Sequence, residues 1–268
     1  MKVSIVIPTY NRPGLALSLA RQIRKYEPSS EIIVVDQSEL KEDHNTISEL
    51  SVIYLENAKV NTSIAKNIGL KRATGEVVFF FDDDIEITPN TLKSHLEEYS
   101  DPNIQGVAGR VINDGETVPE DTDVETGKTN KYLTAFTNNF WSTRKQEVQF
   151  PYGCNMSFRR AVIEKLGGFD EMIPPPGWEE TDLGLRVTGL GKMIFSPGAL
   201  VFHHKAQSGG TRMPQNLWYR NYYWIYGRLI AKHVSFPNNI CSLFRLSIRI
   251  IKEHPRSLAD FITGFTSI

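Results

Sequence analysis

The sequence predicts an α/β fold with a mostly parallel central sheet, and three observations support this. Short apolar runs alternate with helical stretches from the first residue onward, which is the order of a βαβ fold. The runs end in polar residues, as strands do at the carboxyl edge of an open parallel sheet. The run over 77–81 is the clearest, because its five β-branched or aromatic residues lead directly into three carboxylates, Asp82, Asp83 and Asp84.

The expected elements follow in chain order. The predicted strands cover residues 3–7, 31–35, 52–55 and 77–81. Helices are predicted after Pro13, which suits the first helical position, and over 65–73. The stretch from 112 to 150 is polar with little periodicity, so we expect a long excursion there. The sequence lacks both the Rossmann glycine fingerprint and the phosphate-binding lysine loop.

The aspartate triplet points to a metal site. Three adjacent carboxylates repel one another, and a hard divalent cation relieves that repulsion. Two carboxylates, together with substrate phosphates and water, form a usual arrangement for Mg²⁺ or Mn²⁺. The alternative is a solvated acidic turn in which Asp84 caps the next element. The triplet alone leaves both interpretations open.

Eight segments together resemble those of one known family. The first four are VSIVIPTYNRP (3–13), VVD (34–36), AKNIGL (65–70) and FFDDD (80–84). The other four are GCNMSFRR (153–160), GGFDE (167–171), WEETDLGLR (178–186) and PGALVFH (197–203). In this order they resemble the nucleotide-sugar half and then the acceptor half of family 2 glycosyltransferases of the GT-A fold, such as rhamnosyl-, galactosyl- and N-acetylhexosaminyltransferases. We therefore expect a GT-A domain over 1–211, with halves at 1–111 and 112–211, and a helical appendage over 212–268.

The resemblance implies inverting transfer from a nucleotide-diphosphate sugar, with UDP- or dTDP-sugars as the expected donors. The residues expected to bind the donor are Pro8, Thr9, Tyr10, Asn11, Arg12, Asp36, Lys66, Asp82, Asp83 and Arg212. The expected Mn²⁺ or Mg²⁺ ligands are Asp82, Asp84 and His203, with His204 as the fallback. Asp36 is expected to accept from a nucleobase amide. The segment 208–212 is expected to form either a lid over the diphosphate or an ordinary loop.

The acceptor site is expected to include Trp178, Glu179 and Asn155, although packing is the favoured explanation for Asn155. The family commonly reads Glu-Asp-x-Asp where this chain has residues 179–182, so Glu180 falls where the resemblance places the catalytic base. Neighbouring carboxylates should raise its proton affinity, as a general base requires. Asp182 is the second candidate, because Arg186 is a competing partner four residues on. Glu179 is alternatively a first-turn acid that favours the helix dipole.

Composition narrows the class of protein. Thirty basic and thirty-one acidic residues give a net charge of −1, which offers no general attraction to nucleic acid. Cys154 and Cys241 form no zinc pattern or disulfide framework. Met1 leads directly into the first predicted strand, and no apolar run approaches the ~20 residues of a spanning helix. We therefore expect a cytoplasmic protein, either free or peripheral on the inner face of the membrane.

The carboxyl-terminal region is basic, since residues 212–256 contain eight lysines and arginines but one acid, Glu253. Its expected amphipathic helix has Arg245, Arg249, Lys252 and Arg256 on a basic face and Leu243, Phe244, Ile250 and Ile251 on an apolar side. Such a helix suits an anionic membrane, and the acceptor would then be lipid-linked. The alternative is packing of these helices onto the domain or onto a second subunit of a homodimer, through Trp218, Tyr222, Trp224 and Tyr226.

The sequence thus predicts a metal-dependent inverting glycosyltransferase that acts on a glycan or lipid-linked acceptor. A sugar-nucleotide nucleotidyltransferase is one alternative, but it needs a glycine-rich phosphate loop near its amino end, which residues 8–13 do not provide. A non-catalytic sugar-binding protein is the other. It predicts loss of the carboxylates, and all of them are present.

Overall fold

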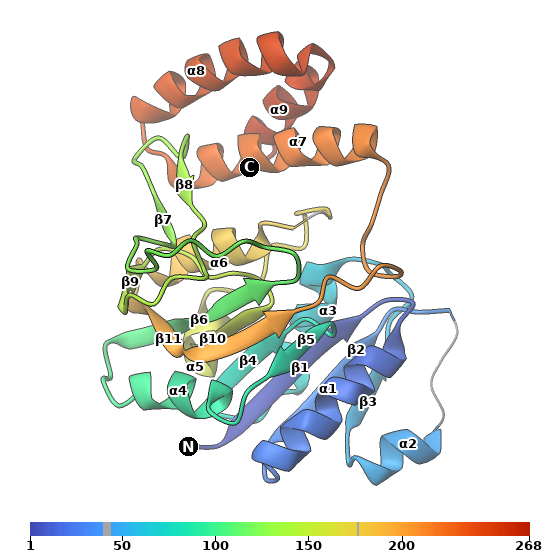
Figure 1. Ribbon diagram of the computed structural model, residues 1–268. Coiled ribbons are helices and arrows are strands. Elements are labelled where there is room, and N and C mark those ends of the chain that lie inside the picture. The colour runs from blue at the N-terminus through green and yellow to red at the C-terminus, as the bar shows by residue number, and fades with distance from the viewer. Residues whose placement is uncertain (40–43, 176) are drawn as a thin grey trace.

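The computed structural model describes residues 1–39, 44–175 and 177–268. The strands of its central sheet are β1 (Val3–Thr9), β2 (Glu31–Asp36), β3 (Ile53–Glu56), β4 (Val77–Phe81), β5 (Ile85–Ile87), β6 (Ile104–Asn113), β9 (Gln146–Val148), β10 (Asn155–Arg159) and β11 (Lys192–His203). Their order is β3-β2-β1-β4-β10-β6-β11-β5, with β9 beside β11 (Figure 1). Most of the strands run in one direction, whereas β5, β9 and β10 run in the other. The sheet is mostly parallel, as predicted.

The helices cover both faces of this sheet and extend beyond it. They are α1 (Pro13–Tyr26), α2 (His44–Glu49), α3 (Thr62–Arg72), α4 (Thr91–Glu98), α5 (Arg160–Lys165), α6 (Glu179–Val187), α7 (Gln215–His233), α8 (Asn238–Glu253) and α9 (Leu258–Phe265), with a 3₁₀ turn, η1 (Pro255–Ser257), before α9. Figure 1 shows α1 and α4 in front of the sheet and α3 behind it. The predicted helix after Pro13 is α1, and the one predicted over 65–73 is α3.

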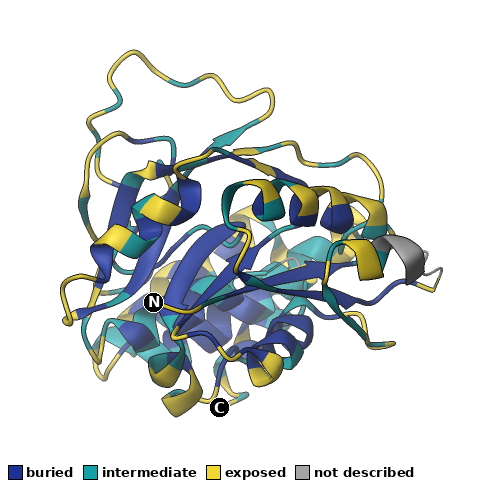
Figure 2. Ribbon diagram, turned by 90° about the horizontal axis from the view of Figure 1, so that it is seen from below, coloured by how far each residue is buried: buried dark blue, intermediate teal, exposed yellow. Residues whose placement is uncertain are grey.

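β4 is the centre of the core, because all five of its residues are buried. Successive side chains point to opposite faces of a strand. Phe79 packs edge-on against His95 of α4, with 5.0 Å between ring centroids, whereas Phe80 packs against Phe169 at 4.9 Å. Figure 2 shows the outcome, with buried strands between helices whose outer sides are exposed.

The parallel strands β1, β2 and β4 bring their polar ends together. β1 pairs with β2 so that Thr9 lies opposite Asp36, and β4 lies on its other side. The triplet at 82–84 follows β4 directly, and Pro13 begins α1 just beyond β1. The predicted convergence at the carboxyl edge is therefore present.

The excursion over 112–150 contains short strands and reaches beyond the sheet. Its hairpin, β7 (Lys128–Thr129) and β8 (Phe136–Thr137), extends towards the carboxyl-terminal helices (Figure 1). The ring of Phe136 lies 6.0 Å from Tyr226 of α7 and 5.2 Å from Trp178, centroid to centroid. The chain then returns to the sheet as β9.

The carboxyl-terminal helices form a second layer with its own core, beyond the carboxyl edge of the sheet (Figure 1). α7 and α9 cross closely, because a Cβ added at Gly227 would lie 2.1 Å from the carbonyl oxygen of Phe261. Tyr222 and Tyr226 of α7 pack their rings against Trp178 of the domain. The aromatic packing predicted as the alternative is therefore found. No helix among the described residues is long and apolar enough to cross a membrane.

The predicted apolar side of α8 is wrong, because its apolar residues occupy two opposite sides. Leu246 and Ile250 face inward and are buried, whereas Phe244 and Ile251 face outward and are exposed. The sequence grouped Ile250 with its neighbour Ile251, although adjacent residues lie 100° apart around a helix. Arg256 lies in η1, outside α8.

Candidate active site

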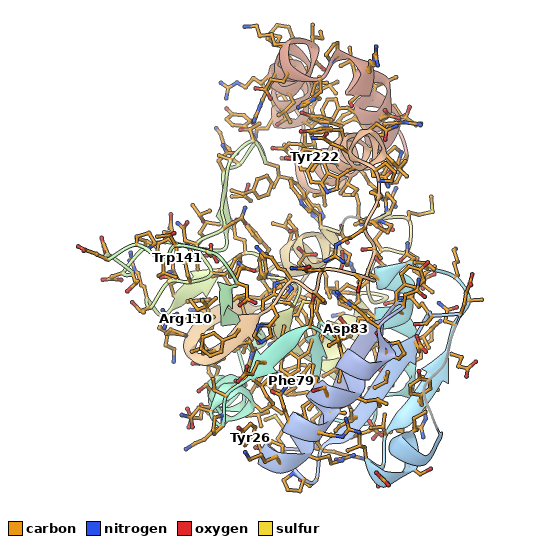
Figure 3. The ribbon with its side chains drawn as sticks, turned by 45° about the vertical axis from the view of Figure 1, so that its right-hand side comes forward. Tyr26, Phe79, Asp83, Arg110, Trp141 and Tyr222 are labelled. Carbon is orange, nitrogen blue, oxygen red and sulfur yellow. The ribbon has the colours of Figure 1, made fainter. Side chains whose placement is uncertain are left out.

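A cavity of about 330 Å³ opens where the central strands end. It is bounded by the loop after β1, the triplet after β4, the end of β11 and the start of α6. The predicted site residues that line it are Pro8, Thr9, Tyr10, Arg12, Lys66, Asp82, Asp83, Trp178, Glu179, Glu180 and His203. Figure 3 shows Asp83 beside the amino end of α1, with Tyr222 of the carboxyl-terminal helices beyond it.

Arg12 ties the loop after β1 to the triplet. Its guanidinium lies 2.7 Å from Asp83 and 3.0 Å from Asp84, and the Thr9 hydroxyl donates to Asp83 at 2.6 Å. Burial raises the pKa of Asp83 to about 6, although Arg12 and Thr9 act in the opposite direction. Arg12 therefore lines the cavity with its charge already matched by two carboxylates.

Asp82, Asp84 and His203 converge at one point; Asp82 and His203 line the cavity, and Asp84 lies behind them. One ligand atom from each lies within 4.8 Å of the other two. The Oδ1 of Asp84 is buried 3.2 Å from Nε2 of His203 and accepts no hydrogen bond of good geometry from the described residues. Carboxylate oxygens suit Mg²⁺ and Mn²⁺, and imidazole is a further competent ligand. The three residues therefore fit a divalent cation.

The pKa shifts differ among the three residues, and that of Asp84 suits metal ligation. Burial alone would raise the pKa of Asp84, but His203 and Arg12 lower it to about 2. Burial raises the pKa of Asp82, against the charges of Lys66 and His203. The pKa of His203 is raised despite its burial, because Asp84 and Asp82 favour the imidazolium. Asp84 is thus ionised at neutral pH, as a metal ligand must be.

Two predicted residues after β11 lie outside the cavity. His204 faces Asp114 at 3.0 Å and is exposed, so it does not join the metal set. Arg212 is also exposed, and its guanidinium donates to the carbonyl of Gly209 at 2.8 Å. The backbone N–H of Gly210 instead donates to the carbonyl of Tyr10, and Gly210 lines the cavity. The segment 208–212 therefore meets the cavity through its backbone, and the expected contact of Arg212 is not supported.

Lys66 and Glu179 form a buried ion pair across the two halves. The Lys66 Nζ lies 2.8 Å from Oε1 of Glu179, and both side chains are buried. The charges of Glu179, Asp82 and Glu180 raise the pKa of Lys66 despite its burial. Burial alone would raise the pKa of Glu179, but Lys66 holds it below its usual value. Lys66 of α3 therefore neutralises the charge of Glu179 on α6. Glu179 does not act only through the helix dipole, because it also joins α6 to α3.

Glu180 follows on α6 and has the opposite electrostatic setting. Burial and the charge of Glu179 raise the pKa of Glu180, and Lys66 offsets this in part. An added Cβ at Gly153 would lie 3.4 Å from the carboxyl carbon of Glu180, so the chain after β9 approaches this side chain closely. The raised proton affinity predicted from the sequence is found.

Asp182, the second candidate base, does not reach the cavity. Its side chain is fully buried and lies 2.8 Å from Arg186, as the sequence alternative predicts. The structure adds Lys232 and His233 of α7, the latter at 2.8 Å. These partners lower the pKa of Asp182 well below its usual range, against its burial. A carboxylate held this way anchors α7, and its expected role as a base is not supported.

Asn155 is buried inside the sheet, so its expected acceptor contact is not supported. Its amide donates to the carbonyls of Arg110 and Ala199 at 3.0 and 2.8 Å, and its oxygen lies 2.9 Å from Nε2 of His95. The side chain joins β6, β11 and α4 across the antiparallel strand β10. The packing explanation is the one the structure supports.

The residues expected to meet a nucleobase lie around the end of β2. Asp36 is buried, and its carboxylate accepts from the backbone N–H of Ser38 at 2.8 Å and from the Tyr54 hydroxyl. Gln37, the next residue, lines the cavity and was not predicted. Asn11 has a left-handed backbone with φ of 56°, and its N–H donates to the Ser38 hydroxyl at 2.6 Å. Asp36 and Asn11 therefore shape the loops beside the cavity and do not line it.

A second cavity, of about 400 Å³, adjoins the first. Tyr152, Trp178 and Glu180 line both. Trp178 has a left-handed backbone with φ of 74°, which is unusual for a bulky residue and is held by the surrounding aromatic packing. The sequence analysis did not predict that Tyr152 lines both cavities. Its position just before the GCNMSFRR segment could have indicated this.

The fold is of the GT-A class, with a candidate metal site at the edge of its sheet and a second cavity beside the first. The chain belongs to glycosyl transferase family 2, because the model of that family matches residues 4–167. This confirms the resemblance found in the sequence.

Curated relatives agree with this membership. The chain is 27% identical over 186 residues to the glucosyl-dolichyl phosphate glucuronosyltransferase of Haloferax volcanii, covering 63% of this chain and 56% of that protein. It is 28% identical over 214 residues to the succinoglycan biosynthesis protein ExoM of Rhizobium meliloti, covering 75% and 66%. The chain spans about half the length of several of the curated relatives it matches.

Solved structures share the fold. The crystal structure of S. aureus TarS 1-349 superposes with a TM-score of 0.65 at 17% identity and covers 99% of this chain and 81% of that chain. The mannosyltransferase PcManGT of Pyrobaculum calidifontis, in complex with GDP-Man and Mn²⁺, superposes with a TM-score of 0.62 at 16% identity and covers 98% and 86%.

Proposed function

We propose that this protein transfers a sugar from a nucleotide-diphosphate sugar to a hydroxyl of a glycan or lipid-linked acceptor, with inversion at the anomeric carbon. The observation that carries the proposal is the position of Glu180 on the wall shared by two adjoining cavities. The first cavity is lined by Asp82 and His203 of the metal set and suits a donor. The second is lined by aromatic and amide side chains, including Phe136 and Asn138, and suits an acceptor sugar.

The donor would lie with its nucleotide along the loop after β1 and residue Gln37, and with its diphosphate at the triplet. UDP- and dTDP-sugars are the proposed donors. TarS has been crystallised with UDP-GlcNAc, and PcManGT with GDP-Man and Mn²⁺, so relatives of this fold accept such ligands. Asp82, Asp84 and His203 would hold Mn²⁺ or Mg²⁺, whose charge would neutralise the leaving diphosphate.

Glu180 is the proposed general base. Its carboxylate would take the proton of the acceptor hydroxyl while that oxygen forms a bond to the anomeric carbon. The bond from this carbon to the diphosphate oxygen breaks on the opposite face, and the electron pair leaves with the diphosphate. One displacement of this kind inverts the configuration. Trp178, which lines both cavities, is placed to stack on a sugar face.

The test is hydrolysis of a panel of UDP-, dTDP- and GDP-sugars by the purified chain, with Mn²⁺, with Mg²⁺ and with EDTA. A glycosyltransferase releases the nucleoside diphosphate slowly when water replaces the acceptor. A nucleotidyltransferase would instead form nucleotide sugars from a nucleoside triphosphate and a sugar phosphate. A sugar-binding protein would give a thermal shift without turnover. Either of the last two results would overturn the proposal.

A further inference from the structure

The outward side of α8 is an exposed apolar stripe. Ile240, Phe244, Ile248 and Ile251 are 54, 68, 41 and 53% exposed. Their spacing of four, four and three residues places them on one side of the helix, opposite the buried Leu246. Figure 1 shows α8 as the helix farthest from the sheet, so the stripe lies on the outer surface of the molecule.

An aromatic residue extends the stripe at the start of the helix. Phe236 is 75% exposed, two residues before α8 begins. Two exposed phenylalanines and three exposed isoleucines within sixteen residues are more than scattered surface apolar groups, which are normal singly. An exposed apolar stripe of this size indicates a surface that binds a partner.

Basic side chains flank the stripe along one side. Arg245, Arg249 and Lys252 are exposed and lie next to it around the helix. Arg249 pairs with Glu253 at 3.0 Å, the one acid on α8, and Arg245 lies over the ring of Tyr132 at 4.8 Å. Lys252 forms no ion pair with a described residue. The flank is thus net positive.

A cavity at the carboxyl end of α8 continues this basic edge. Its volume is about 410 Å³, and two cations, Arg220 and Arg256, and one acid, Glu253, are among the residues that line it. Arg220 is partly matched by Asp260 at 3.3 Å, whereas Arg256 pairs with no described acid. Guanidinium groups bind phosphates well, so this end of the helix also favours an anionic ligand.

We propose that the outward side of α8, together with Phe236, is a docking surface for an anionic lipid bilayer. The apolar stripe would enter the boundary between headgroups and acyl chains, while Arg245, Lys252 and Arg256 meet lipid phosphates. A second copy of the chain fits less well, because it would bring two basic flanks into one interface with a single acid on each α8. The surface would hold the enzyme where a lipid-linked acceptor is presented.

The test is flotation of the full chain with phosphatidylcholine vesicles, with and without phosphatidylglycerol. Binding is expected only to the anionic vesicles and is expected to fall with salt. Phe244→Ser should weaken binding about tenfold, because it removes a phenyl group that the bilayer would bury. Leu190→Ser, at an exposed leucine on the turn after α6, is the matched control and should leave binding unchanged.

Two charge-reversal variants test the role of the basic flank. Lys252→Glu should lower binding about twentyfold at low salt, since each basic group near such a surface contributes about fivefold. Lys71→Glu, an exposed lysine in the last turn of α3, is its control. The melting temperatures of all variants are compared first, to establish that each one folds.

Equal binding to neutral and anionic vesicles, or no effect of Phe244→Ser, would overturn the proposal. So would the absence of wild-type binding at low salt. Sedimentation equilibrium on the same proteins tests whether a second copy of the chain occupies the surface instead. A dimer that Phe244→Ser dissociates would assign the surface to that second copy. The readout is binding and not sugar transfer, so failure here leaves the proposed reaction untouched.

Discussion

Removing the charge of Lys66 probes the contact between the two halves most directly. Lys66→Met keeps most of the length of the side chain and leaves Glu179 buried without its partner at 2.8 Å. Both side chains are at most 5% exposed, so water screens the pair little. Breaking a buried pair by removing one partner costs about 3–5 kcal/mol. We expect a loss of this size in the free energy of unfolding at pH 8.

The loss should shrink as the pH falls. In the native protein Lys66 holds the pKa of Glu179 below its usual value, so the pair stabilises the fold above the unfolded pKa and this contribution disappears in acid. In Lys66→Met, burial still raises the pKa of Glu179, and the opposing charge of Lys66 is gone. A carboxylate with a raised pKa destabilises the fold as the pH rises through and above the unfolded pKa of about 4.3. The difference between the two proteins is therefore larger at pH 8 than at pH 5.

The assay is urea unfolding at both pH values for the native chain, Lys66→Met, Glu179→Gln and the double variant. The double variant buries no unmatched charge at this pair, so it should recover most of the loss. Lys93→Met is the matched control, because Lys93 and Glu97 form an exposed pair at 3.8 Å, worth less than about 1 kcal/mol. A Lys66→Met protein within about 1 kcal/mol of the native one at pH 8, or a double variant no more stable than Lys66→Met, would refute the reasoning.

Three further predictions concern individual carboxylates. Asp84→Asn should abolish Mn²⁺-dependent transfer, because it removes an ionised member of the metal set; native activity in EDTA equal to that in Mn²⁺ would contradict this. Glu180→Gln should lower transfer about 10²–10⁴-fold with unchanged donor affinity by calorimetry. The raised pKa of Glu180 also predicts that native activity falls with acid at a pH above the usual glutamate range. Asp182→Asn should lower the free energy of unfolding by about 3–5 kcal/mol, because it leaves Arg186 without its acid and Lys232 with Asp170 alone; a denaturant midpoint equal to that of the native chain would argue against the anchor.

The sequence was sufficient to predict the donor edge of the site, because its signals are local. A strand buried on both faces needs apolar residues throughout, and a carboxylate that follows such a strand must emerge at the edge of the sheet. Asp82 and Asp84 could therefore be assigned to one place from their own neighbourhood. His203, at the end of a later strand, was assigned to the same place through the family resemblance, and the structure places it beside them.

The contacts that could not be predicted from the sequence join segments that are far apart along the chain. Lys66 and Glu179 are 113 residues apart, and no periodic pattern pairs a lysine on one helix with an acid on another. Asn155 was misplaced because β10 runs antiparallel between two neighbouring strands, so the residue that begins it points into the sheet. A polar residue after a loop resembles a site residue until its hydrogen-bond partners are known.

The anchoring of α7 has a consequence for modularity. Arg228 and Lys232 pair with Asp170 at 2.8 Å, and Lys232 and His233 with Asp182, so two acids of the acceptor half take their counter-charges from a helix that follows the sheet domain. Residues 1–211 are consequently not a transplantable unit. A chimera that joins this sheet domain to the tail of a relative leaves Asp170 without its two cations and Asp182, two residues from the proposed base, with Arg186 alone, unless positions 228, 232 and 233 are transferred too.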